Sequence, residues 1–600
     1  MRECFPLSPG LRTKSRGRTE TPWAGVRASR IAASRQATVF ALAFSFILFY
    51  GSQTLRAAAS TLEHFYPVAV QAGTSNTITA IGKFDPWPPK VWVDSPGIVF
   101  NAETNSGKFT VEIAADAPIG PHLIRVFNEQ GTSGPRFLIV TGEPQSAEQE
   151  PNDDFKKPQA LERLPISLNG RLDKSGDVDS FAITLEAGQT FIASLEAYTL
   201  ASPMDAVLRL VDSRGVQVAL NHDGRTFDPF LTWTATSTGT YILQVFGFAY
   251  PAISDVKFTG GNACVYRLHV SRGPYLHYTL PLGVQRGART TLRPFGWNLG
   301  SSLGREFEFD GSSLAADIRL ATVQMPDFEN ALTLPAGDGP ELIEKEPNNS
   351  TNEAVRLVAP CAVTGCIETV GDEDRFPFAA KKDEKLVFEV QSASLGLPLD
   401  GWLKIEDAKG KELAKDDDSS NADPVLEWTS PEDSVFVAAV GSVLHRGGPD
   451  YLYRLTIQPA VPAWKAVVAD SAFTIEPGKT NDLKVAVKRL HGFKSKLTVS
   501  AKGLPEGLGI ESVEVPEKDG DVTLKLIASA EAKPYTAPIQ LVVTEAESET
   551  EHRVIAELIS SGLNNGVPQG FSRLAIESTD QLWLTVLPAP AEKPADAKVD

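Results

Sequence analysis

The chain has 600 residues, of which 42% are hydrophobic and 22% charged. At roughly 100–150 residues per domain, this length excludes a single core and predicts three to five domains. The formal net charge of −18 argues against nucleic acid as a partner, because phosphate binding needs clustered Lys and Arg.

Residues 1–59 have the layout of a secretory signal. A basic segment (27–35) precedes the apolar run ATVFALAFSFILFYG (37–51), and small residues at 57–59 offer a cleavage site. The apolar run is shorter than the roughly 20 residues that a membrane span needs. We therefore expect an exported protein that is secreted, periplasmic or part of the cell envelope, with an uncleaved membrane anchor as the alternative.

The next stretch, 60–142, is predicted to be an immunoglobulin-like β-sandwich, which we call the first A module. It contains GTSGP (131–135), the only nucleophile-like phrase of the chain. The segment RFLIV follows and reads as a strand, where a subtilisin-like serine motif would continue with Ala-x-Pro and a helix. The eight histidines show no paired-ligand spacing, and there is no phosphate loop or dinucleotide fingerprint. We expect no catalytic role for Ser133 and no enzyme activity.

Two longer stretches, 143–273 and 341–459, are predicted to be copies of one domain, the first and second B units. The phrase EQEPNDDFKKPQAL opens the first copy and EKEPNNSTNEAVRL the second. A shift of 195 then lays LNGRLDKSGDVDSFAI on VTGCIETVGDEDRFPF and NHDGRTFDPFLTW on DDDSSNADPVLEW. The copies end on VYRLHV and LYRLTI. A repeat of this kind indicates a duplicated structural unit.

The remaining segments complete an A-B-A-B order. Residues 274–340 form a small second A module, because LPLGVQRGARTTLRPFG matches YPVAVQAGTSNTITAIG of the first. Residues 460–587 are predicted to be a further immunoglobulin-like β-sandwich, and the Pro- and Ala-rich tail 588–600 to be disordered. Short alternating or apolar runs separated by Gly, Pro, Asn and Asp predict an all-β protein of five tandem β-sandwich modules.

The two B units resemble the bacterial pre-peptidase C-terminal domain. That family is a jelly-roll-like β-sandwich of secreted peptidases and other exported proteins, and it is similar to the collagen-binding domains of clostridial collagenase. The second copy departs from the pattern, since SPEDSVFVAAVG lacks the Gly-x-Tyr of STGTYILQVFG. The resemblance implies an accessory module rather than an enzyme, and calcium held by acidic residues of the opening phrase.

Oxygen donors suitable for calcium gather at the start of each B unit. Calcium takes six to eight oxygen ligands from carboxylates, amides and carbonyls. The candidate ligands of the first unit are Glu148, Glu150, Asn152, Asp153, Asp177 and Asp179. Those of the second unit are Glu344, Glu346, Asn348, Asn349, Asp372 and Asp374. The same residue types suit turns and caps, so a purely structural role stays open. Asn349 in place of Asp153 removes one charge and predicts a weaker second site.

Other polar and aromatic groups are expected to be structural. The third acidic set, Asn221, Asp223 and Asp228 with Asp416, Asp418 and Asp423, is interpreted as a turn. Trp233 and Trp428 are expected in the core, and the cysteines at 264, 361 and 366 as buried thiols. Candidates for contact with an extracellular protein or polysaccharide are Phe248, Tyr250, Tyr451 and Tyr453, although a sandwich buries most such residues.

The sequence thus favours an exported, non-catalytic, calcium-binding scaffold. The alternative is a secreted hydrolase, or a peptidase accessory or relic, with an active site that the sequence does not reveal. Membrane association is expected only through an uncleaved signal segment.

Overall fold

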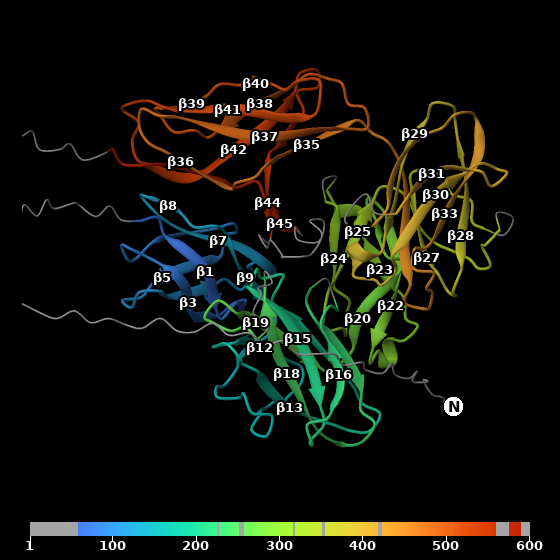
Figure 1. The fold of residues 1–600 in the computed structure, drawn as a ribbon, viewed down its shortest axis with the longest axis horizontal. Coiled ribbons are helices and arrows are strands. Elements are labelled where there is room, and N and C mark those ends of the chain that lie inside the picture. The colour runs from blue at the N-terminus through green and yellow to red at the C-terminus, as the bar shows by residue number, and fades with distance from the viewer. Residues whose placement is uncertain are drawn as a thin grey trace, which may run out of the picture. The chain divides into compact units, whose positions relative to one another are not determined.

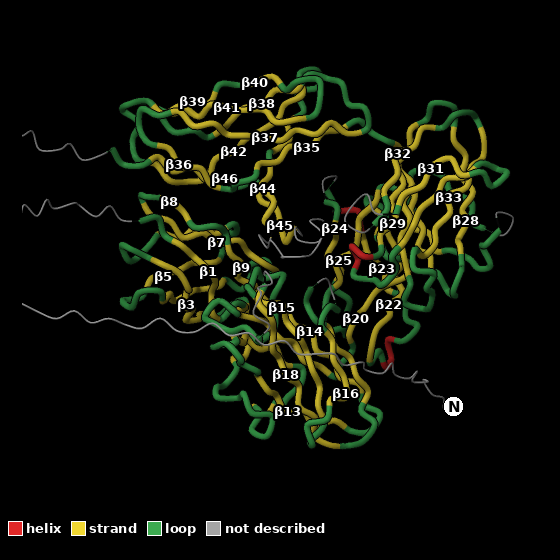
Figure 2. The backbone as a smooth tube through the Cα atoms, in the orientation of Figure 1, coloured by secondary structure: helices red, strands yellow, loops and turns green. Residues whose placement is uncertain are grey.

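The structure, a computed structural model, describes residues 58–224, 227–250, 257–315, 318–350, 354–417, 423–559 and 575–589. The predicted signal segment, except its last two residues, and the predicted tail, except its first two, lie outside these ranges. Regular structure in the described ranges is strand, apart from three short 3-10 helices (Figure 2). These helices are η1 (Gly300–Ser302), η2 (Gly311–Ser313) and η3 (Ala393–Leu395). The all-β prediction is confirmed, and no helix in the described ranges has the length and apolar character to cross a membrane.

Alternating side chains explain why these segments form half-buried strands. In β41 (Gly520–Ala528), Val522, Leu524 and Leu526 are buried, while Thr523 and Lys525 between them are exposed. Successive side chains of a strand point to opposite faces, so such a segment covers a core with one face and meets water with the other. The described strands form ten sheets, and each sheet draws its strands from one of five stretches of the chain (Figure 1).

The first A module has sheets of order β1-β3-β6-β5 and β2-β9-β7-β4, with β8 paired to β7. Phe65, Ile78, Phe109 and Val126 belong to its core. Its strands are β1 (Thr61–Tyr66), β2 (Ala69–Gln71), β3 (Ser75–Lys83), β4 (Lys90–Val93), β5 (Ile98–Ala102), β6 (Lys108–Ile113), β7 (Gly120–Asn128), β8 (Gly131–Thr132) and β9 (Arg136–Thr141).

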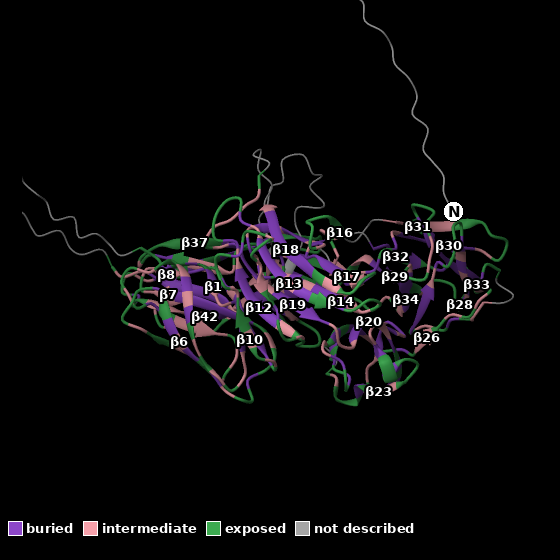
Figure 3. Ribbon diagram, turned by 90° about the horizontal axis from the view of Figure 1, so that it is seen from below, coloured by how far each residue is buried: buried purple, intermediate pink, exposed green. Residues whose placement is uncertain are grey.

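The first B unit has two five-stranded sheets, β10-β12-β19-β14-β17 and β11-β13-β18-β15-β16. Its core includes Phe181, Phe191, Leu208 and Tyr266, and Figure 3 shows β18 buried along much of its length. The strands are β10 (Gln145–Ala147), β11 (Gln159–Ala160), β12 (Ile166–Arg171), β13 (Asp179–Leu185), β14 (Thr190–Glu196), β15 (Met204–Val211), β16 (Gln217–Asn221), β17 (Phe230–Thr234), β18 (Gly239–Ala249) and β19 (Val265–Ser271).

The second A module is the smallest, with three-stranded sheets β20-β22-β23 and β21-β25-β24. Leu276, Leu292 and Leu334 belong to its core. Its strands are β20 (Tyr275–Leu280), β21 (Val284–Gln285), β22 (Arg289–Trp297), β23 (Phe307–Asp310), β24 (Leu320–Val323) and β25 (Leu332–Gly337).

The second B unit has sheets β26-β27-β34-β29-β32 and β28-β33-β30-β31. Phe376, Phe388, Leu403 and Tyr453 belong to its core. Its strands are β26 (Glu341–Ile343), β27 (Cys361–Cys366), β28 (Glu373–Ala380), β29 (Lys385–Gln391), β30 (Gly401–Glu406), β31 (Glu412–Asp416), β32 (Val425–Thr429), β33 (Ser434–Ser442) and β34 (Leu452–Pro459).

The C-terminal module has two six-stranded sheets around one core. Their orders are β39-β41-β37-β35-β44-β45 and β36-β46-β42-β38-β40, and β43 pairs with β42. Besides β41, the strands are β35 (Ala463–Val468), β36 (Ala472–Ile475), β37 (Thr480–Leu490), β38 (Leu497–Lys502), β39 (Leu508–Ile510), β40 (Val513–Glu514), β42 (Tyr535–Glu545), β43 (Glu551–Arg553), β44 (Ile555–Ile559), β45 (Ala575–Thr579) and β46 (Leu582–Val586).

The two B units repeat one strand order and one register. The sheet β12-β19-β14-β17 corresponds to β27-β34-β29-β32, and β13-β18-β15-β16 corresponds to β28-β33-β30-β31. Gly170 pairs with Tyr266 as Gly365 pairs with Tyr453. A single bridge between Leu357 and Phe378 stands where the first unit has β11 beside β13. The duplication inferred from the sequence is therefore a duplication of the fold.

Candidate metal sites in the repeated units

The candidate ligands of the first B unit are organised around a buried tyrosine. Tyr266 on β19 is fully buried, and its ring lies over Gly170, where a Cβ atom would sit 2.1 Å from the ring Cζ. Only glycine leaves room for this approach. The Tyr266 hydroxyl lies 2.5 Å from Asp179 Oδ2 and 3.0 Å from Glu148 Oε2. The tyrosine therefore brings the opening phrase and the start of β13 to one point.

Backbone donors hold the carboxylates of this unit in place. Glu148 Oε1 accepts a hydrogen bond from Arg171 N at 2.7 Å, and Glu150 Oε2 accepts one from Asn152 N at 2.9 Å. Asp177 Oδ2 accepts from Asp173 N at 2.5 Å. One donor atom each from Glu150, Asp153 and Asp177 lies within 4.8 Å of the others. Glu148 and Asp179 thus meet at Tyr266, while Glu150, Asp153 and Asp177 form a second cluster whose charges act on that pair.

Several buried polar atoms of this network have no hydrogen-bond partner among the described residues. Both the amide oxygen and the amide nitrogen of Asn152 are in this state, although the residue is only 1% exposed. The same holds for Oδ1 of Asp177 and of Asp179, two residues with no exposed surface. A buried polar group without a partner is costly, and a buried carboxylate more so. The cluster therefore contains buried oxygen atoms that could bind a cation, and it carries a net negative charge.

Burial and mutual repulsion shift the titration of the buried pair. Burial raises the pKa of Glu148 to about 7. Burial, reinforced by the charge of Glu148, raises the pKa of Asp179 to about 10. Two carboxyl groups that share one hydroxyl resist double ionisation and hold a proton between them. A divalent cation would take over the role of that proton.

The second B unit has a related arrangement, in which a different set of three carboxylates comes closest. The Tyr453 hydroxyl donates to Asp374 Oδ2 at 2.6 Å, and Glu344 Oε1 accepts from Cys366 N at 2.5 Å. Asn348 Oδ1 and Asp374 Oδ1 are buried and have no partner in the described part of the chain. Glu344, Glu346 and Asp374 each offer an oxygen within 4.8 Å of the others. Burial raises the pKa of Glu344 to about 10 and that of Asp374 to about 7.

The two sites differ at the position of Asp153 and Asn349. Lys174 Nζ lies 2.8 Å from Asp153 Oδ2 and 3.6 Å from Asp177 Oδ1. In the second unit Asn349 Nδ2 donates to Asp372 Oδ1 at 3.0 Å instead. Five carboxylates and one ammonium in the first site, and four carboxylates in the second, give both a formal charge of −4. The first site is therefore the more negative one only if the Lys174 ammonium leaves Asp153 when calcium binds. That the second site is the weaker one stays a prediction.

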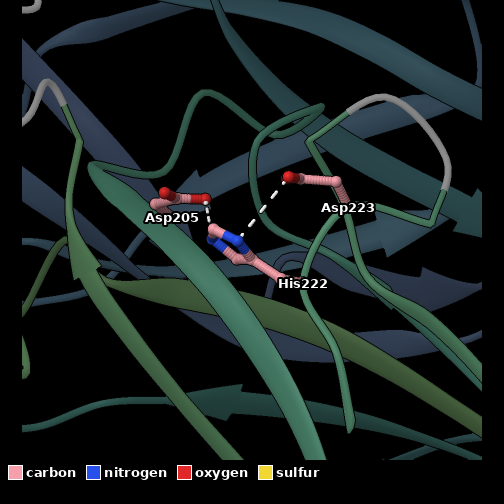
Figure 4. Close-up of side chains that lie close together, drawn as sticks. All are labelled: Asp205, His222 and Asp223. Atoms are coloured by element: carbon pink, nitrogen blue, oxygen red, sulfur yellow. Dashed lines mark ion pairs between the residues drawn. The ribbon is translucent and has the colours of Figure 1, made fainter. Parts of the chain in front are cut away.

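The third acidic set is mostly structural, as its interpretation as a turn required. Asp228 accepts hydrogen bonds from the backbone of Ala197, Tyr198 and Thr199 and from the Thr199 hydroxyl. In the second unit, Asp423 accepts from the backbone nitrogens at 392–394. Asn221 and Asp416 likewise each accept from one backbone nitrogen. Asp418 lies outside the described residues. Asp223 Oδ2 lies 3.6 Å from His222 Nδ1, and His222 Nε2 lies 3.0 Å from Asp205 Oδ1 (Figure 4).

Of the four aromatic candidates for ligand contact, one is buried and three are half-buried. Tyr453 is completely buried and belongs to the site, so its assignment to a ligand-binding surface was wrong. Phe248, Tyr250 and Tyr451 are half-buried. Among the core predictions, Trp428 is buried and Trp233 packs against the core of its unit while partly exposed.

The predicted thiols and the serine have ordinary surroundings. Cys264, Cys361 and Cys366 are free thiols, the first two buried and the third half-buried. Ser133 is 4% exposed, and its hydroxyl donates to Gly134 O and accepts from Val126 N. These bonds give the Ser133 hydroxyl a structural role at the edge of β7.

Sequence reasoning missed the two tyrosines as site residues. Each lies in the closing Tyr-Arg-Leu strand, more than a hundred residues from the opening phrase. The available signal was the coincidence of a shared tyrosine and a shared glycine in both copies. Their contact follows only from the pairing of β12 with β19 and of β27 with β34.

Comparison with known proteins gives limited matches. No family model matches the chain. A probable subtilase-type serine protease of Deinococcus radiodurans is 33% identical over 103 residues, which are 16% of this chain and 14% of that protein. The chain thus spans about a seventh of the length of this curated relative.

Three solved structures are similar at TM-scores too low to support an argument. The match to tripeptidyl peptidase 2 covers 88% of this chain and 40% of that protein, at 8% identity and a TM-score of 0.14. The match to the fibronectin(III)-like modules of Clostridium thermocellum CbhA covers 36% of this chain and 91% of those modules, at 10% identity and a TM-score of 0.11. The match to the N-terminal eight Ig domains of the Down Syndrome Cell Adhesion Molecule covers 83% of this chain and 72% of those domains, at 9% identity and a TM-score of 0.12.

Proposed function

We propose that this protein is an exported, non-catalytic β-sandwich scaffold that binds one calcium ion at the opening of each B unit. The observation that carries the proposal is the set of buried, unpartnered oxygens that recurs at corresponding positions, on Asn152 and Asp179 in one unit and on Asn348 and Asp374 in the other. A site of carboxylate and amide oxygens suits a hard cation such as Ca²⁺, whereas softer metals prefer nitrogen or sulfur.

Calcium would supply the positive charge that each cluster lacks. In the first unit, Glu148, Glu150, Asp153, Asp177 and Asp179 offer carboxylate oxygens, and Asn152 offers an amide oxygen. The opening phrase and the start of β13 would then be joined through the ion as well as through Tyr266. We expect calcium to stiffen the entrance of each B unit and so to fix the direction in which the preceding segment leaves it.

The accessory and exported character rests on the sequence. The resemblance of the B units to the pre-peptidase C-terminal domain supports a module that accompanies a catalytic protein. The 103-residue match to part of a probable subtilase-type serine protease agrees with that role. The secretory layout of residues 1–59 supports export. An extracellular protein or polysaccharide is the proposed class of partner.

Thermal unfolding of the full chain with calcium or with a chelator tests the calcium sites. Calcium at a hundredfold excess over its Kd should stabilise each B unit by about 2.7 kcal/mol. Asp179→Asn should abolish the effect in the first unit and Asp374→Asn in the second, because an amide keeps the shape of the side chain but cannot become the carboxylate that calcium binds. The matched control is Glu162→Gln, a change at an exposed carboxylate of the first unit.

The double variant Asp179→Asn/Asp374→Asn should unfold identically in calcium and chelator. If the unaltered protein also unfolds identically in both, the clusters are turns and caps only, and the calcium proposal is wrong. If instead a serine-reactive probe labels the purified protein and it hydrolyses protein substrates, the non-catalytic assignment is wrong.

A further inference from the structure

A buried histidine of the first A module has a hydrogen-bond acceptor at each of its ring nitrogens. His122 lies on β7 and is only 6% exposed. Its Nε2 is 2.8 Å from the carbonyl oxygen of Pro118, and its Nδ1 is 3.1 Å from Asp94 Oδ1. Asp94 directly follows β4, and Pro118 lies in the loop between β6 and β7. The ring therefore joins two segments that are separate in the sequence.

These two contacts require a hydrogen on both ring nitrogens. A carbonyl oxygen only accepts hydrogen bonds, so Nε2 must carry a hydrogen. The second oxygen of Asp94, Oδ2, accepts from Leu123 N at 2.7 Å, which suits an ionised carboxylate. Nδ1 must then donate to Asp94 Oδ1, and the ring is an imidazolium. The pair of His122 and Asp94 thus holds one proton more than a neutral imidazole beside a carboxylate.

Asp94 is the charged group that faces the ring. The neighbouring strand β9 places Leu138 opposite His122, and Asp116 in the loop before β7 is exposed. The other charged side chains of β7 and of the strands beside it lie elsewhere: Lys90 opposite Phe127, Arg125 at Ser133 O, Arg136 at Glu63 O, and His64 beside Arg136. The hydrogen bond with Asp94 accordingly raises the pKa of His122 above its ordinary value, although burial acts in the opposite direction.

Loss of the extra proton would set two lone pairs against each other. Nε2 would keep its bond to Pro118, whereas Nδ1 and Asp94 Oδ1 would repel each other and separate. The turn 94–97 also contacts the loop 114–119 through the hydrogen bond from Ala114 N to Gly97 O, at 2.8 Å. A change at His122 therefore acts on both segments.

We propose that His122 is a pH-dependent bridge, which holds the turn 94–97 to the loop 114–119 when it is protonated and releases the turn when it is neutral. The ordinary pKa of an imidazole lies close to neutral pH, so small changes in acidity alter its charge. Because the folded-state pKa lies above the unfolded value, the stabilisation by the bridge is complete below about pH 6.5 and is lost as pH rises through the raised pKa.

The bridge would couple acidity to the shape of a surface loop. Loops held by a rigid scaffold commonly carry recognition, and this loop includes Ile119, which is 62% exposed. The inference concerns the first A module alone and does not depend on calcium at the B units.

NMR of the full chain, with isotope-labelled histidine, follows the charge of the ring. The signal that His122→Asn removes belongs to His122, and in the unaltered protein it should titrate with a midpoint above about 6.5. Asp94→Asn should lower this midpoint by about one unit or more, because a neutral amide replaces the carboxylate. The control His445→Asn replaces an exposed histidine of the second B unit by a residue that tolerates its left-handed backbone. It should leave the His122 midpoint unchanged.

Hydrogen exchange of the backbone amides at 94–97 and 114–119 measures the bridge itself. After correction for the intrinsic pH dependence of exchange, protection should be about tenfold or more higher near pH 6 than near pH 8.5. In His122→Gln and in Asp94→Asn this difference should disappear, since neither variant holds the extra proton. Asp94→Asn leaves the imidazole in place and so tests the bridge even where a substitution at His122 prevents folding.

Three results would overturn the proposal. The first is a His122 midpoint at or below that of free histidine. The second is a midpoint that Asp94→Asn leaves unchanged. The third is protection of the two segments that is equal at both pH values in the unaltered protein, which would leave His122 as a structural residue only.

Discussion

At the scale of single residues, the most informative groups are the two tyrosines whose hydroxyls donate hydrogen bonds to buried carboxyl groups. Burial and the neighbouring carboxylates raise the pKa of Tyr266 and Tyr453 well above that of free tyrosine. Both hydroxyls therefore stay protonated and serve as donors. Each one neutralises part of the charge of Asp179 or Asp374, and each leaves the second carboxylate oxygen available.

The raised pKa values predict how stability depends on pH without metal. The carboxyls of Glu148 and Asp179, with pKa values of about 7 and about 10, bind protons in the folded state that they release in the unfolded state. Their contribution to stability is therefore complete below about pH 4 and is lost as pH rises through 7 and beyond. In chelator, unfolding in urea should need less denaturant at pH 8 than at pH 5.5.

Calcium should prevent this loss of stability at high pH, because the bound ion replaces the protons on Glu148 and Asp179. Calcium binding near pH 6.5 should release protons, which calorimetry in buffers of different ionisation enthalpy measures. Asp179→Asn is the matched variant for the first unit. Metal-free stability that rises from pH 5.5 to pH 8, or calcium binding without proton release, would contradict the assignment of these carboxyls.

At the scale of elements, the turn before β17 shows how a similar acidic phrase serves structure alone. Asp228 is 4% exposed, and its two oxygens accept four hydrogen bonds from the segment 197–199. Both oxygens of Asp228 therefore have donors, whereas Oδ1 of Asp179 has none among the described residues. A structural carboxylate is thus distinguished from a candidate metal ligand by whether both of its oxygens accept hydrogen bonds. The residue type alone does not distinguish them.

This contrast gives a prediction for the turn. Asp228→Ala should destabilise the protein by about 3 kcal/mol or more, since hydrogen bonds to a charged group contribute about 1.5–3 kcal/mol each and the buried donors lose their partner. Asp423→Ala should have a similar effect in the second unit. Urea unfolding followed by tryptophan fluorescence measures both. The stabilisation by calcium should remain in each variant, and its loss would show that the turn belongs to the metal site.

At the scale of the whole molecule, the sequence predicted the repeated architecture because its signals are local. Alternating side chains and turn residues indicate strands, and the shift of 195 between copies matches the strand register of both B units. The six candidate ligands of each unit lie in two short segments, and the structure brings these segments together.

Contacts between distant strands were not predictable in the same way. The Tyr266 hydroxyl meets Glu148 across 118 positions of sequence, and only the pairing of β12 with β19 places them together. The contact between Asp205 and His222 depends on where the ladder of β15 and β16 ends. Lys174 also escaped prediction, because the direction of its ammonium group toward Asp153 depends on the turn before β13.

The calcium content of the full chain at equilibrium tests the central claim most directly. After dialysis against excess calcium, atomic analysis should find two calcium ions per chain, one for each B unit. Asp179→Asn and Asp374→Asn should each reduce this number to one, and the double variant to zero. A calcium content at the background level of the dialysis buffer, or one that neither substitution changes, would contradict the account.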